Sequence, residues 1–62
     1  MTVSVKLFNS TQIDNFCYWV KYFPNITVIN ADYSKSLVNL SIPDTLENLI
    51  RGRPEVVDMI RM

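Results

Sequence analysis

The segment from Gln12 to Phe23 constrains the fold most, because its aromatic residues separate onto two sides only if the segment is helical. At about 100° per residue, its apolar side chains form one stripe with Trp19 at the edge. The residues of this stripe are Ile13, Phe16, Cys17, Val20 and Phe23. Tyr18 and Tyr22 fall on the opposite, polar side. The segment therefore predicts an amphipathic helix that covers a core with one face and exposes two tyrosines on the other.

The boundaries of this helix are predicted from residues on either side of the stripe. Thr11, followed three residues later by Asp14, resembles a capping arrangement at a helix start. Pro24 lacks an amide hydrogen and disfavours helical geometry in the residue before it. We therefore expect the helix to end at Phe23.

Three other segments have the patterns of β-strands. Residues 2–7 alternate polar and apolar side chains, which is typical of a strand with one face on a core. The β-branched run 26–29 predicts a second strand, and residues 37–42 predict a third. The loop between them, residues 30–36, has no glycine, so we expect a longer hairpin loop than a two-residue turn. In the third strand the residues expected to face inward are Val38, Leu40 and Ile42.

The C-terminal third predicts helical structure. Asp44 begins the sequence Asp-Thr-Leu-Glu, which offers an N-cap and an acidic first turn for a second helix with an exposed Glu47–Arg51 pair. Gly52 is the only glycine and is placed where a left-handed helix cap would be. Pro54 suits the first turn of a short terminal helix. A single kinked helix over residues 44–62 is the alternative.

These elements predict a small two-layer α+β domain that spans residues 1–62 in the order β-α-β-β-α, with a short C-terminal helix. We expect a three-stranded sheet with both helices on one face and a polar, solvated second face. The first helix would cross right-handed between two parallel neighbouring strands, and the third strand would pair antiparallel with the second.

The length of 62 residues allows only a small core, and Cys17 is the only cysteine, so no disulfide can stabilise it. Oligomerisation is a common alternative for small domains. The hydrophobic content of 48% is high for so short a chain and suggests more apolar surface than one core can hide. We therefore expect a homodimer or a larger protein partner.

The composition excludes much chemistry. The chain has no histidine, so the usual general base and metal ligand is missing, and Cys17 should be a buried, inert thiol on the apolar stripe. One glycine cannot build a phosphate-binding loop. We predict that the protein is not an enzyme and that it binds no metal and no cofactor.

The sequence predicts a cytoplasmic protein without a membrane partner. Its first residues alternate polar and apolar instead of forming the core of a signal peptide. No apolar run approaches the roughly 18 residues of a membrane-spanning helix. The composition also suits a factor encoded by a virus, a plasmid or another mobile element, which is a hypothesis about genetic context.

The leading functional hypothesis is a regulatory or protein-interaction module, acting as a homodimer that binds another protein through Tyr18, Tyr22 and Trp19. Structural packing or an ordinary solvated surface is the alternative explanation of the two tyrosines. A nucleic-acid-binding regulator is the second hypothesis, and a structural subunit of a larger complex is the third. The six basic and six acidic residues cancel, so a nucleic-acid contact would depend on a local patch near the C-terminus. That patch consists of Arg51, Arg53 and Arg61.

Overall fold

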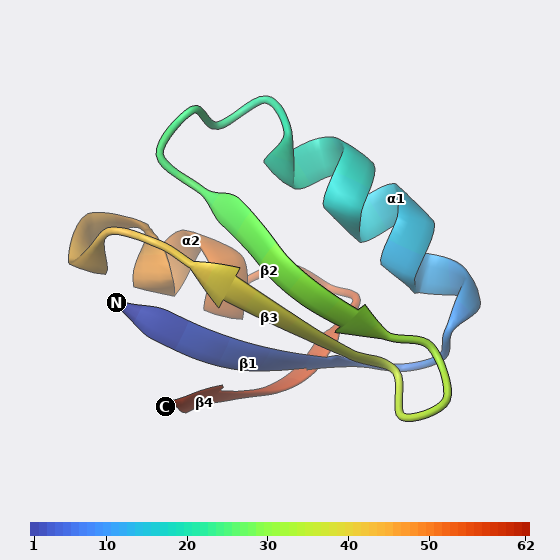
Figure 1. Ribbon diagram of the computed structural model, residues 1–62. Helices are drawn as coiled ribbons and strands as arrows, with labels where there is room; N and C mark the ends of the chain where they lie inside the picture. The colour runs from blue at the N-terminus through green and yellow to red at the C-terminus, as the bar shows by residue number, and fades with distance from the viewer.

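The computed structural model describes residues 1–62 and has two helices on one face of a four-stranded antiparallel sheet (Figure 1). The predicted α+β class and the position of both helices are confirmed. The elements in chain order are β1 (Thr2–Leu7), α1 (Thr11–Val20), β2 (Thr27–Asp32), β3 (Leu37–Ser41), the 3₁₀ turn η1 (Asp44–Leu46), α2 (Glu47–Arg51) and β4 (Val56–Arg61).

The strand order is β2-β3-β1-β4, which differs from the predicted order. The hairpin of β2 and β3 is antiparallel, as predicted, but β3 lies between β1 and β2. The expected pairing of β1 with β2 as parallel neighbours is therefore wrong. The physical reason is that the short β2–β3 loop returns β3 into the gap that the α1 crossover leaves open beside β1. The resulting order of elements and strands is the split β-α-β topology.

The largest correction concerns the C-terminal residues, which form an edge strand and no helix. β4 pairs antiparallel with β1 from Arg61 opposite Val3 to Val56 opposite Leu7. The predicted terminal helix, the kinked alternative and the three-stranded sheet are all wrong. A three-stranded sheet would leave the backbone of one side of β1 unpaired, and the β-branched residues of this segment favour a strand at that position.

The ends of both helices also differ from the expectation. Gly52 has φ −82°, so it adopts no left-handed cap, and α2 ends with its amide donating to the Asn48 carbonyl. Thr11 does not cap α1, because its hydroxyl donates to the Asn9 side chain and Ser10 holds the cap position without a side-chain bond. The regular part of α1 ends at Val20, and turns continue the chain to Pro24.

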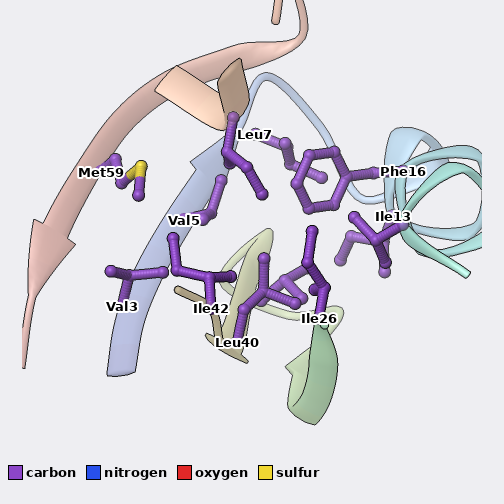
Figure 2. Packing of buried hydrophobic residues seen from close by; sticks show 12 residues of the cluster. Val3, Val5, Leu7, Ile13, Phe16, Ile26, Leu40, Ile42 and Met59 are labelled. Carbon is purple, nitrogen blue, oxygen red and sulfur yellow. The ribbon is translucent and has the colours of Figure 1, made fainter. Parts of the chain in front are cut away.

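The core lies between the sheet and the two helices and contains only hydrophobic side chains (Figure 2). Its 12 buried residues are Val3, Val5, Leu7, Ile13, Phe16, Val20, Ile26, Val38, Leu40, Ile42, Ile50 and Met59. The inward alternation predicted for the first and third strands is confirmed. Of the predicted helix stripe, Cys17 and Phe23 are only partly buried at the margin of the core, together with Trp19.

Phe16 is the largest fully buried side chain, whereas Phe8 is 67% exposed. Phe16→Ala should lower the free energy of unfolding by about 3–5 kcal/mol, because it leaves a cavity under α1. That loss is comparable to the total stability of a domain this small. The matched Phe8→Ala variant should change it by less than about 0.5 kcal/mol. Urea denaturation of both variants measures the difference, and similar losses would contradict this description of the core.

Candidate functional site

Tyr18 and Tyr22 lie on the outer side of α1 and of the turn that follows it, as predicted. Their side chains are 64% and 71% exposed. The two ring centroids are 5.8 Å apart and the ring planes meet at 83°, which is an edge-to-face arrangement. The residues therefore form one continuous aromatic surface that the core does not cover.

Trp19 does not belong to this surface. Its ring packs against Phe16 and Phe23, with centroid distances of 5.9 Å and 5.0 Å. The guanidinium of Arg53 stacks over the ring at 4.1 Å from the centroid. The structure thus separates Trp19 from the two tyrosines and assigns it a packing role between α1 and the turn before β4.

The three arginines of the predicted patch are all paired with carboxylates. Arg51 and Arg61 both bind Glu47, and the Arg51 nitrogen lies 2.9 Å from the carboxylate, as expected for the predicted helical pair. Arg53 binds Glu55 at 3.0 Å. The structure brings Arg51 and Arg61 together around one glutamate and places Arg53 beside Trp19. Because each positive charge has a nearby negative partner, the field available to attract phosphates is reduced.

A cluster of polar groups lies on the side of α1 that faces β2. The Tyr33 hydroxyl, just after β2, donates a 2.6 Å hydrogen bond to Asp14, and this bond raises the pKa of Tyr33. Burial raises the pKa of the half-buried Cys17 thiol, with Asp14 acting in the same sense and Lys21 opposing it. Cys17 is less buried than predicted, but its thiolate is still disfavoured.

The exposed edge of β2 is a feature that the sequence analysis missed. The ladder between β2 and β3 has a bulge between Val28 and Asn30, so Ile29 has no partner on β3 and its side chain is 54% exposed. The run of apolar residues was recognisable, but its position at the edge of the sheet depends on the strand order.

The structure has no ligand-sized pocket and no group of three potential metal-ligating side chains. None of its helices has the length and apolar character needed to cross a membrane. Comparisons with protein-family models, curated proteins and solved structures give no match.

The ion pairs of Glu47 with Arg51 and Arg61 should make the stability of the fold depend on pH. Hydrogen bonds from Arg61 and then Arg51 lower the pKa of Glu47 below its ordinary value. A lowered pKa contributes stability above the ordinary glutamate range near pH 4, and this contribution is lost as the pH falls through the folded-state pKa. Glu47→Gln should therefore lower Tm most near pH 7, and its difference from the wild type should narrow towards about pH 3.

Thermal denaturation followed by circular dichroism across this pH range measures the two curves. Asp32, whose pKa is lowered mainly by the Ser34 hydroxyl, is unchanged in the variant and provides a common acid-dependent background. A difference in Tm that stays constant with pH would contradict the assignment to Glu47.

Proposed function

We propose that this chain is a small non-enzymatic protein-interaction module that acts as a homodimer and binds another protein through Tyr18 and Tyr22. The observation that carries the proposal is the side-by-side exposure of these two rings, Tyr18 on α1 and Tyr22 in the turn that follows it. Tyrosine supplies a large amphipathic contact area at low entropic cost and is enriched in protein interfaces.

Packing against the core explains Trp19 but does not explain the tyrosine pair. Trp19 contacts Phe16, Phe23 and Arg53, and these contacts are explained by a structural role at one margin of the core. The tyrosine rings contact each other and remain mostly in solvent. Tyr18 and Tyr22 are therefore the proposed contact residues, and Trp19 packs on the core side of the same segment.

Binding to nucleic acid remains the alternative function, and it would use Arg51, Arg53 and Arg61. The pairing of these side chains with Glu47 and Glu55 favours the protein-binding proposal over this alternative. The nucleic-acid hypothesis requires binding that weakens steeply with salt concentration.

The further proposal of a cytoplasmic location is consistent with a single cysteine that has no disulfide partner.

The double variant Tyr18→Ala and Tyr22→Ala tests the proposed contact. Because both rings are exposed, it should change the free energy of unfolding by no more than about 1 kcal/mol while abolishing specific capture of a partner. Affinity capture with immobilised wild-type and variant protein, compared by quantitative mass spectrometry, measures the loss.

The matched control is Phe8→Ala, which removes another mostly exposed aromatic ring from a different surface. Proteins retained by the wild type and by this control, but not by the double tyrosine variant, are the expected result. Equal retention by all three proteins would overturn the assignment to Tyr18 and Tyr22. Salt-sensitive binding of a mixed DNA and RNA pool that needs the arginines would support the alternative function instead.

A further inference from the structure

We propose that two copies of this chain pair antiparallel through the exposed edges of their β2 strands, joining the two four-stranded sheets into one. This inference deepens the proposed function, because it depends on the homodimer named there and specifies its interface. Two features of the structure carry it: the difference between the two edges of the sheet, and the arrangement of charges beside β2.

The backbone hydrogen bonds at both ends of the β1–β3 ladder show which residues of β3 bond to β1. Leu7 donates from its amide to the Ser36 carbonyl at 2.9 Å. Ile42 donates in the same way to the Met1 carbonyl at 2.8 Å. Alternate residues of an antiparallel strand direct their backbone amide and carbonyl groups to opposite neighbours. The backbone groups of the even-numbered residues of β3 therefore point towards β1, and those of its odd-numbered residues point towards β2.

It follows that part of the β2 backbone faces away from the sheet. Val28 and Ala31 pair with Leu40 and Val38, which are even-numbered residues of β3 and bond to β1. The amide and carbonyl groups of β2 at these positions therefore point to the open edge. Together with the exposed Ile29 side chain, they form a strand edge with free donors, free acceptors and apolar cover.

The opposite edge, on β4, is protected by one side chain of β4 and one of α2. The Met62 amide donates to the Thr2 carbonyl, so the backbone groups of Met59 point away from β1 to the open side. Asp58 accepts a 2.8 Å hydrogen bond from the Met59 amide, and Arg51 donates to the Met59 carbonyl at 3.3 Å. Bonded backbone groups and charged side chains both discourage the addition of a strand.

On β2, by contrast, no charged residue occurs from Thr27 to Ala31. The bulge at Ile29 and the charge of Asp32 at the end of the strand are the features of β2 that ordinarily discourage edge pairing. The edge available for a new strand is therefore the β2 edge.

The charges beside β2 favour a second copy of the chain as the partner. Asp14 on α1 and Lys21, the residue that caps the C-terminus of α1 with helical backbone angles, are seven residues apart. This spacing places them about two turns apart on the same side, separated by roughly 10 Å. The charges of both residues influence the pKa of the Cys17 thiol between them, Asp14 raising it and Lys21 lowering it. Asp14 also accepts a hydrogen bond from Tyr33, which follows the end of β2. The negative end of this row therefore lies beside the end of β2, and the positive end lies towards its start.

An antiparallel pairing of two β2 strands reverses this row in the second copy. Because α1 packs against β2 (Figure 1), the two α1 helices also become antiparallel neighbours. Asp14 of each copy then lies towards Lys21 of the other. A contact related by a two-fold axis requires such a self-complementary surface. The same arrangement brings both tyrosine pairs onto one helical layer, which doubles the proposed contact surface.

Light scattering over a concentration series tests the interface with a matched pair of substitutions. Ile29→Lys puts a charge at the β2 edge, and Ile60→Lys changes the same residue type in β4, where the side chain is 59% exposed. We expect dimers for the wild type and for Ile60→Lys, and a dimer dissociation constant raised by about tenfold or more for Ile29→Lys. Equal effects of the two substitutions, or a wild type that stays monomeric, would overturn the inference.

A charge exchange tests the two-fold arrangement independently of Ile29 and guards against a variant that fails to fold. Asp14→Lys and Lys21→Asp should each weaken the dimer by roughly threefold to tenfold, and the double variant should restore it. Restoration cannot come from the Asp14–Tyr33 bond, because the double variant still lacks it. Absence of restoration would overturn the antiparallel pairing.

Capture of a partner by Tyr18 and Tyr22 is a separate measurement, so failure of dimerisation and failure of the proposed function are distinguishable. A monomer that still captures its partner through the tyrosines would overturn the homodimer and its β2 interface but leave the tyrosine contact intact. A dimer that captures no partner would overturn only the tyrosine contact.

Discussion

The central position of β1 is the constraint on which the other elements depend. Val3, Val5 and Leu7 turn one face of this strand into the core, and its backbone pairs with β3 on one side and β4 on the other. Both neighbours come from distant parts of the chain, and each arrives after a helix that covers the same face of the sheet (Figure 1). The chain therefore buries its small core by closing two long connections around one strand, and this leaves β2 and β4 as the edges.

Features that depend on local periodicity could be predicted from the sequence. Alternation fixed the inward residues of β1 and β3, and the helical period placed Tyr18 and Tyr22 opposite the core. The C-terminal strand could not be predicted in the same way, because Val56, Val57 and Ile60 fit the spacing of an apolar helix face as well as the composition of a strand. The segment becomes a strand because it pairs with the side of β1 that β3 leaves open. That open side can be recognised only from the strand order.

The candidate surfaces show the same division between local and distant effects. Exposure of the tyrosines follows from one helix, whereas the stacking of Arg53 on Trp19 joins α1 to a turn far along the chain. The binding of Arg61 to Glu47 likewise joins β4 to α2. The Glu47–Arg51 pair was predictable from its helical spacing, whereas Arg61 becomes a second partner of Glu47 only when β4 pairs with β1.

The two edges of the sheet differ in how far side chains bond to their outward backbone groups, and this difference connects the fold to the proposed function. A small sheet with two bare edges would add strands without limit, whereas one bare edge permits a single closed pairing with a second copy. The side chains of Asp58 and Arg51 occupy the backbone groups of Met59 on β4, and no side chain does so on β2. The same side of the molecule carries α1, with Tyr18 exposed on the helix and Tyr22 exposed in the turn that follows it. The features suited to interaction therefore lie on or beside α1 and β2. On α2 and β4, by contrast, charged side chains bond to one another and to the backbone of the β4 edge.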